Sequence, residues 1–223
     1  MMARLLLLSV LVLIGNAGCS RQESSEAQAP RAQQTTTVPG EEAAAPNKLK
    51  FKDADDRERF SLKPKDDGAK LVDGEDRELA RYKWKGVALK VSGPDDAVLG
   101  HVVSSAGGAL AVRDAEQRQI LFTFARQGTG WRLNDAKGTL LYAVSPDDEG
   151  ASIQDATGTE VARVKVREGK VSVRDATGRT LLATKSLVRA DAAACLAFER
   201  MELPLRMGLL FHLQSSPGEG RQP

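Results

Sequence analysis

Residues 190–213 read ADAAACLAFERMELPLRMGLLFHL, the most apolar run of the chain outside its N-terminus. The part from Ala192 to Phe198 contains no polar residue, so a helix formed there is apolar on every side. Such a helix lies either deep inside a protein or in a membrane. A membrane span needs about 20 mostly apolar residues, and this run is interrupted by Glu199, Arg200, Glu202 and Arg206. We therefore expect the run to be buried inside the protein.

Pro204 divides this apolar run. Proline lacks the amide hydrogen that a helix interior requires, so it kinks or ends a helix just before it. The sequence predicts one helix of about 12 residues from Asp191, whose charge suits a helix start, and a second from Leu203 to Leu213. Together they make up a predicted central helix over residues 191–213.

A repeat with a period near 20 residues, typical of a repeated supersecondary unit, precedes the helix. Its clearest copies are VRDAEQRQIL (112–121), LNDAKGTLL (133–141), IQDATGTEV (153–161) and VRDATGRTLL (173–182). Their aspartates are Asp114, Asp135, Asp155 and Asp175, and Asp53 and Asp73 take the same role earlier, with a degenerate copy around Asp95. Aspartate supports a turn through its side chain, and glycine accepts a positive φ. Each copy therefore predicts a β-hairpin.

The flanks of these turns alternate between apolar and polar residues. In residues 161–167, Ala162 and Val164 share one face, while the basic residues share the other. This period of two indicates strands with one solvated face, and six or seven hairpins give about 12 to 14 of them. Closing the meander removes its exposed edges, and a bore of about twelve strands is too wide for side chains alone to fill. The predicted fold is mainly β: a closed antiparallel barrel of about 12 strands, built from hairpin repeats, that encloses the C-terminal hydrophobic helix.

With these hairpins and the closing helix, residues 49–213 resemble the barrel of the tubby C-terminal domain, the phospholipid scramblases and the plant LURP-one-related proteins. The resemblance implies a lipid-related role, although no phosphoinositide-binding or calcium-binding motif is found to carry over. The hairpins are also similar to those of YD-repeat shells, which are usually longer and lack the terminal helix. A YD-repeat-like meander in an envelope assembly is therefore the alternative.

The N-terminus has the features of an export signal over residues 1–18. Arg4 supplies the positive charge, an apolar run from Leu5 to Ile14 follows, and small residues end the segment. The next residues, Asn16-Ala17-Gly18-Cys19, resemble a bacterial lipoprotein signal, in which the chain is cut before the cysteine and the cysteine is acylated. The family prefers leucine where Asn16 stands, and the alternative is ordinary cleavage that leaves Cys19 as a thiol.

The lipoprotein resemblance implies a lipid anchor on Cys19 and, because Ser20 follows it, a place in the outer membrane. Residues 19–48 are poor in apolar side chains and are predicted to be a disordered linker. The barrel domain is expected over residues 49–214, and residues 215–223 are expected to be a disordered tail.

The sequence offers no catalytic constellation, cofactor motif or metal-ligand spacing. Cys195 is expected to be a small buried hydrophobe, and His101 and His212 have no ligand-type neighbours in the sequence. Trp84 and Trp131 are expected to pack the barrel rather than bind a sugar. A formal net charge of +2 gives no case for nucleic acid, which favours a strongly basic surface.

One surface feature points to a partner. If residues 161–167 pair with residues 170–175, a basic stripe forms on one outer face from Arg163, Lys165, Arg167, Lys170 and Arg174. Such a stripe is suited to anionic lipid, where each charge contributes about 1 kcal/mol; the alternative is a solvated strand face that prevents aggregation. The sequence thus predicts a non-enzymatic, membrane-anchored envelope protein that binds a partner or belongs to an assembly, with lipid binding or transfer as an alternative.

Overall fold

The structure, a computed structural model, describes residues 48–215. The predicted export signal, Cys19, most of the predicted linker and the tail from residue 216 lie outside the described residues. The described part contains fourteen strands. They are β1 (Leu49–Lys52), β2 (Glu58–Lys65), β3 (Gly68–Asp73), β4 (Glu78–Lys85), β5 (Ala88–Ser92), β6 (Val98–Ser104), β7 (Leu110–Arg113), β8 (Ile120–Gln127), β9 (Gly130–Asp135), β10 (Leu140–Asp147), β11 (Gly150–Asp155), β12 (Glu160–Arg167), β13 (Lys170–Asp175) and β14 (Thr180–Thr184).

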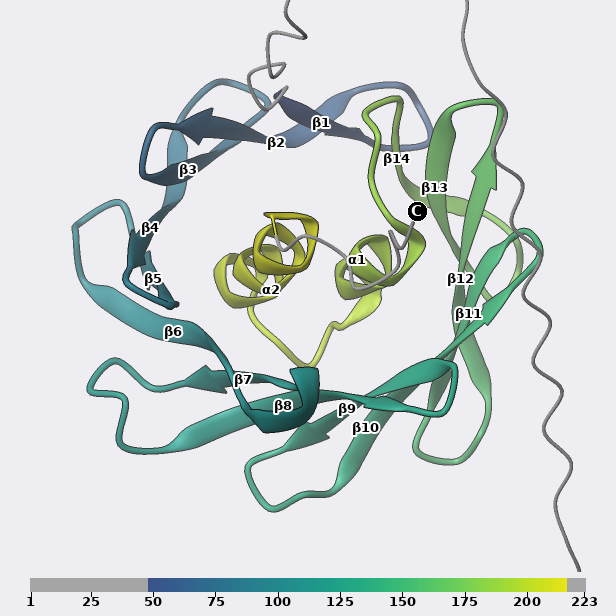
Figure 1. Cartoon of the computed structure of the whole chain (residues 1–223). Coiled ribbons are helices and arrows are strands. Elements are labelled where there is room, and N and C mark those ends of the chain that lie inside the picture. The colour runs from purple at the N-terminus through teal and green to yellow at the C-terminus, as the bar shows by residue number, and fades with distance from the viewer. Residues whose placement is uncertain (1–47, 216–223) are drawn as a thin grey trace, which may run out of the picture. The chain divides into compact units, whose positions relative to one another are not determined.

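The strands form a closed antiparallel barrel (Figure 1). Each strand pairs with the next one in the chain, and β14 pairs back to β1 through the register Lys52↔Ala183. The predicted count of about 12 strands is wrong, because all seven copies of the repeat, the degenerate one included, form hairpins. The mainly β class and the closure of the barrel are confirmed.

The seven turns of the repeat share one end of the barrel, which we call the turn end. In the Asp155 turn, one carboxylate oxygen accepts hydrogen bonds from the backbone amides of Thr157 at 2.8 Å and Thr159 at 3.1 Å. The residue three positions after the aspartate has a positive φ, as at Gly158 with 83°, which explains the glycine in the motif. Hydrogen bonds, first from the Thr157 hydroxyl and then from these amides, hold the pKa of the Asp155 carboxyl below its usual value.

The degenerate copy departs from this pattern. Gly93 takes the place of the capping aspartate, since its amide donates to the Ala97 carbonyl at 2.8 Å as the aspartate amides do in the other copies. The carboxylate of Asp95 accepts a hydrogen bond from the Ala97 amide at 3.1 Å instead. The predicted role of Asp95 is therefore corrected by two positions, and the hairpin forms without the side-chain cap.

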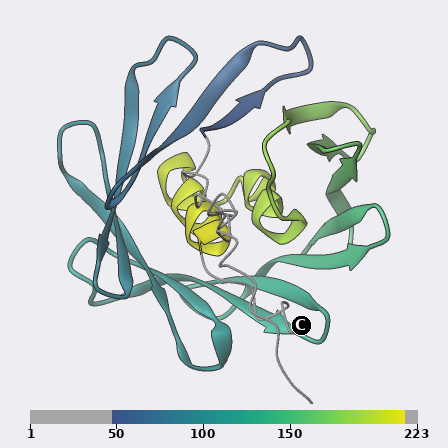
Figure 2. The same cartoon turned by 45° about the horizontal axis from the view of Figure 1, so that its top comes forward.

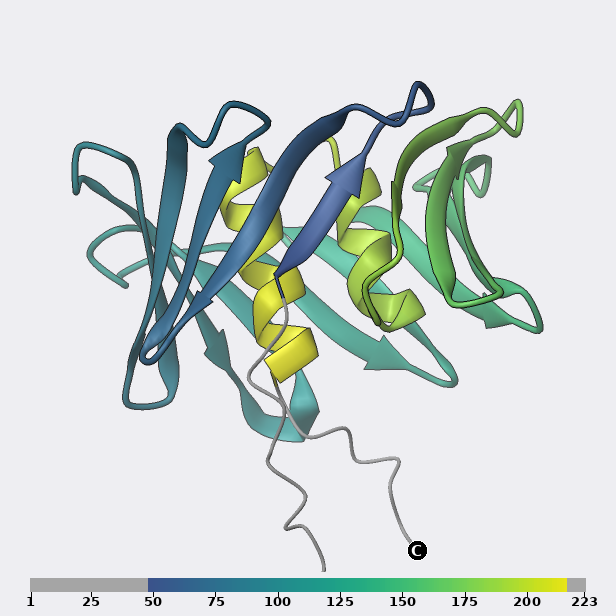
Figure 3. The ribbon, with the colours of Figure 1, turned by 90° about the horizontal axis from the view of Figure 1, so that it is seen from above.

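The other end of the barrel is the entry end, at which β1 begins. The six remaining connections between strands lie here, because consecutive strands run in opposite directions. Seen from above, the start of β1 and the C-terminal end of the last helix lie at this same end (Figure 3).

The chain after β14 forms two short helices rather than one long one. α1 (Ala190–Ala194) continues as a 3₁₀ turn, η2 (Cys195–Ala197), and α2 (Leu203–Ser215) follows. A first helix of about 12 residues was expected here, but Phe198 has φ −81° and ψ 68°, which no helix accepts. The predicted start of the second helix at Leu203 is confirmed.

Both helices pack against the inward faces of the strands. α1 contacts β10 to β13, α2 contacts β4 to β7, and Figures 1 and 2 draw them within the ring of strands. The alternation of the strands explains this packing: in β12, Ala162 and Val164 are buried, whereas Arg163 and Lys165 lie on the other face.

Candidate functional site

The five residues of the predicted basic stripe come together on one outer face. Strands β12 and β13 pair as predicted, with Arg163 opposite Arg174, Lys165 opposite Ser172 and Arg167 opposite Lys170. The predicted grouping of the five cations is therefore confirmed, while their contact with lipid stays a prediction.

Three of the five cations already have acidic partners. Arg163 pairs with Asp147 at 2.5 Å and with Glu160 at 2.6 Å. Lys165 pairs with Glu149 at 2.8 Å, and this hydrogen bond lowers the pKa of the Glu149 carboxyl. Arg167 pairs with its neighbour Glu168 at 3.3 Å. Three of the five cations are thus partly neutralised by neighbouring acidic residues, although such exposed pairs are weak.

Closure of the barrel adds further lysines to this face. Lys50 and Lys52 of β1 lie on its outward face, with Lys48 just before the strand, while Leu49 and Phe51 are buried. β14 is followed by Lys185. Because β1 pairs with β14, and β14 with β13, these residues continue the stripe around the barrel. We call the combined surface the basic band: Lys48, Lys50, Lys52, Arg163, Lys165, Arg167, Lys170, Arg174 and Lys185.

Sequence reasoning missed the β1 and β14 lysines. The alternating stretch KLKFK, residues 48–52, was a signal for outward lysines, but placing it beside the predicted stripe requires the contact of β1 with β14, some 130 residues away in the chain.

The centre of the basic band lacks acidic partners. Within residues 48–215, Lys170, Arg174 and Lys185 form no ion pair, and the Nε atom of Arg174 is buried without a hydrogen-bond partner. The band's edge on β1 is paired, with Lys48 and Lys50 both on Glu58 at 3.2 and 3.3 Å. The excess positive charge therefore concentrates where β13 meets β14.

The pKa of Asp56 is lowered by lysines from the strands that close the barrel. Its carboxyl accepts a hydrogen bond from Lys52 at 2.8 Å, and this bond is the main reason that its pKa is lowered. Lys185 and Lys170 add to the lowering through their charges alone. All three lysines thus act on the same point of the surface.

Two hollows lie along the basic band. The seam hollow, of about 590 Å³, lies where β1 and β14 meet, and the strand hollow, of about 1050 Å³, lies over β12 and β13. Lys170 and Lys185 line both hollows. The two hollows are therefore joined by two lysines that form no ion pair among residues 48–215.

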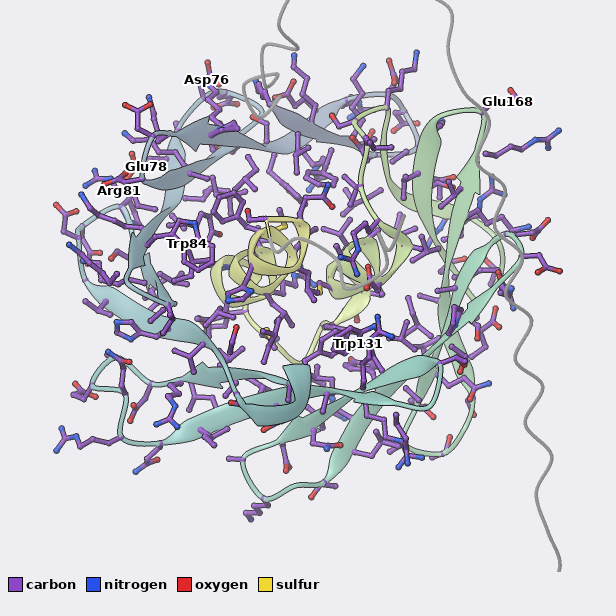
Figure 4. The ribbon with its side chains drawn as sticks, in the orientation of Figure 1. Asp76, Glu78, Arg81, Trp84, Trp131 and Glu168 are labelled. Atoms are coloured by element: carbon purple, nitrogen blue, oxygen red, sulfur yellow. The ribbon has the colours of Figure 1, made fainter. Side chains whose placement is uncertain are left out.

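The tryptophans pack the barrel, as predicted. Trp131 stacks on Phe124 with ring centroids 4.8 Å apart, and Trp84 contacts His212 and Phe211 at 5.0 and 6.3 Å. Figure 4 shows both tryptophans on the inner side of the strands, between the sheet and the helices.

The remaining singled-out residues are also structural. Cys195 is completely buried, and burial raises the pKa of its thiol well above the usual value, so it stays a neutral thiol. Burial likewise lowers the pKa of His212, and His101 lies 7% exposed with Nδ1 3.4 Å from the Asp114 carbonyl.

Two further searches concern ligands and membranes. Among residues 48–215, no three histidine, cysteine or acidic side chains are grouped so as to hold a metal ion. No helix in this described part has the length and apolar character needed to cross a membrane.

Comparison with known proteins does not assign this chain to a family. No family model matches the chain, and a search of curated proteins finds no match. A solved structure of a protein from Arabidopsis thaliana is similar over 69% of this chain and 90% of its own, with 12% sequence identity and a TM-score of 0.39. A TM-score this low carries no inference, so membership of the tubby-like, scramblase or LURP-one-related families stays a prediction.

Proposed function

We propose that this chain is a non-enzymatic protein of the bacterial envelope, tethered by lipid on Cys19, that binds anionic lipid surfaces through the basic band. The observation that carries the proposal is the concentration of unpaired positive charge at Lys170, Arg174 and Lys185. Basic residues near an anionic membrane contribute about 1 kcal/mol each. The export signal and Cys19 support the tether, with an outer-membrane location following from Ser20.

The proposal places binding on the outside of the barrel. We infer that α1 and α2 act as one apolar plug in the bore, as the resemblance to tubby-like barrels implies. Support comes from the burial of both segments: every residue from Ala192 to Phe198 is at most 7% exposed, and residues 207–213 of α2 are all buried. A filled barrel with a charged outer band is suited to docking rather than to catalysis.

Removing the two central lysines should weaken membrane binding. Residues 43–223 form a compact unit with the complete core, so this fragment can be tested without the signal and linker. With Lys170→Gln and Lys185→Gln combined, we expect binding to phosphatidylglycerol vesicles to fall about 10- to 30-fold, because two charges are lost. Co-sedimentation at low and high salt measures the affinity, and the difference should shrink as salt screens the charges.

A matched control carries the same charge change elsewhere on the barrel. Lys90 on β5 and Arg132 on β9 also form no ion pair among residues 48–215 and lie far from β13 in the strand order. Replacing both by Gln should leave binding within about twofold. Equal losses in the two double variants would show only a general charge effect, and no binding by the unaltered fragment would reject the proposed function.

The tether is tested separately in cells. Replacing Cys19 by Ala should move the protein from the membrane fraction to the soluble fraction, because a chain without acyl groups keeps only the weaker electrostatic contact. Fractionation at high salt, followed by immunoblotting, measures the distribution. A Cys19→Ala chain that stays in the membrane fraction at the same level as the unaltered chain would contradict the anchor.

A further inference from the structure

A third hollow lies at the entry end of the barrel and is mostly apolar. It measures about 500 Å³ and lies between the start of β1, the end of β2, the loop after β14 and the C-terminal end of α2. We call it the mouth pocket; its main lining residues are Leu49, Leu62, Pro64, Lys185, Leu187 and Phe211. Its volume lies within the range of about 300–1,000 Å³ that is usual for small-molecule sites.

Leu187 is held at the rim of this pocket in an exposed position. Its side chain is 89% exposed, the highest value among the large hydrophobic residues of the described part. Its carbonyl accepts a hydrogen bond from the side-chain Nε2 of Gln214 at 3.0 Å, and the neighbouring Ser186 hydroxyl donates to the Lys48 carbonyl at 3.3 Å. The loop is therefore fixed on both sides while its leucine faces solvent.

A cation that has no acidic partner among residues 48–215 lies beside this apolar pocket. Lys185 lines the mouth pocket, the seam hollow and the strand hollow together. A ligand that satisfies both surfaces needs an apolar part for the pocket and a negative group for Lys185. That combination is an anionic amphiphile.

We propose that the mouth pocket binds one acyl chain of an anionic lipid, whose headgroup lies against Lys185. The inference rests on the proposed function, which supplies the anionic lipid, and adds where its apolar part goes. The position of the pocket supports a lipid occupant, because it lies at the end of the barrel where β1 begins, and the predicted tether precedes β1 in the sequence. The predicted disordered linker over residues 19–48 would have a mean reach of about 30 Å, which would keep the entry end close to the bilayer.

The two tryptophans provide an internal probe, since the chain contains no others. Trp84 lies against Phe211, which lines the mouth pocket, with ring centroids 6.3 Å apart. Trp131 instead stacks on Phe124 and borders a different hollow, near α1. In fragment 43–223, the variant Trp131→Phe reports on Trp84 alone, and Trp84→Phe reports on Trp131 alone.

Vesicles of phosphatidylglycerol with brominated acyl chains test the inference. Bromine quenches tryptophan fluorescence at short range, so Trp84 emission should fall at least about twofold relative to unbrominated vesicles, and Trp131 emission should change much less. The variant Leu187→Asp should abolish the quenching of Trp84 while co-sedimentation through the basic band persists. Val87→Asp is the matched control, because Val87 is 79% exposed in another connection at the entry end, and it should leave the quenching unchanged.

The outcomes separate this inference from the proposed function. Vesicle binding without quenching of Trp84, or with equal quenching of both tryptophans, overturns the acyl-chain site and leaves the basic band standing. Quenching of Trp84 by free dibromostearate without binding to anionic vesicles supports the site and rejects membrane docking through the band. A dimer that Leu187→Asp disrupts, with no quenching, assigns the pocket to a second copy of the chain and overturns the inference.

Discussion

A chain that ends at residue 189, before α1 begins, should lose cooperative unfolding altogether. The removed part contains 14 of the 42 buried hydrophobic residues of the described structure. Without it, the inward faces of β4 to β7 and β10 to β13 lose the helices that cover them. Removing a third of the core should cost more free energy than the domain has to spare. Exposing apolar surface to water costs about 25 cal/mol per Å², and domains are stable by only about 5–15 kcal/mol.

Calorimetry and near-ultraviolet circular dichroism measure this outcome. The matched control ends at residue 215, which keeps α1, α2 and every buried hydrophobic residue of the described part. We expect a single sharp transition for the control and none for the shorter chain. A shorter chain that is soluble and melts cooperatively would show that the barrel stands without the helices, and the proposed plug would be wrong.

The barrel was predictable because its turns carry local signals. Each hairpin is determined within a few residues. An aspartate accepts hydrogen bonds from two backbone amides, and a residue with positive φ follows three positions later, as at Asp155 and Gly158. The strand count was harder, because in the copy around Gly93 the chain makes the same turn without the side-chain cap. A motif search finds the cap, whereas the fold requires only the backbone conformation.

The helix break at Phe198 had no local signal before Pro204. An apolar run such as Ala192 to Phe198 indicates burial, but the residue at which a buried helix ends depends on what its side chains must reach. Here the Phe198 ring packs against Tyr142 on β10 and Phe124 on β8. The ring makes these contacts from a non-helical backbone at residue 198, and contacts of this kind are set by the tertiary structure.

The candidate site was predictable within one hairpin and not beyond it. Arg163 and Arg174 face each other because residues that flank one turn have a fixed register. The acidic partners of the stripe are harder to predict. Asp147, which pairs with Arg163, and Glu149, which pairs with Lys165, come from the preceding hairpin and depend on its register with β12. The lysines of β1 depend on closure, which is the longest-range contact in the barrel.

Replacing Phe198 by Ala should cost about 3–5 kcal/mol in the free energy of unfolding, the range for a buried phenylalanine. The side chain is completely buried, and its ring stacks on Tyr142 with centroids 5.3 Å apart and tilts against Phe124 at 5.6 Å. Phe124 stacks in turn on Trp131, so the lost ring removes one side of an aromatic cluster. The neighbouring strands belong to a closed barrel and cannot move inward freely, which leaves a cavity in place of the ring.

Urea unfolding of fragment 43–223, followed by tryptophan fluorescence, measures this loss as a lower midpoint with an unchanged slope. Phe198→Leu should lose clearly less than Phe198→Ala, because it keeps most of the apolar volume. Leu187→Ala is the surface control and should change stability by no more than about 0.5 kcal/mol, since its side chain is 89% exposed. A loss below about 1 kcal/mol for Phe198→Ala would mean that the barrel wall relaxes into the space, and the rigidity that closure implies for the strands around Phe198 would be wrong.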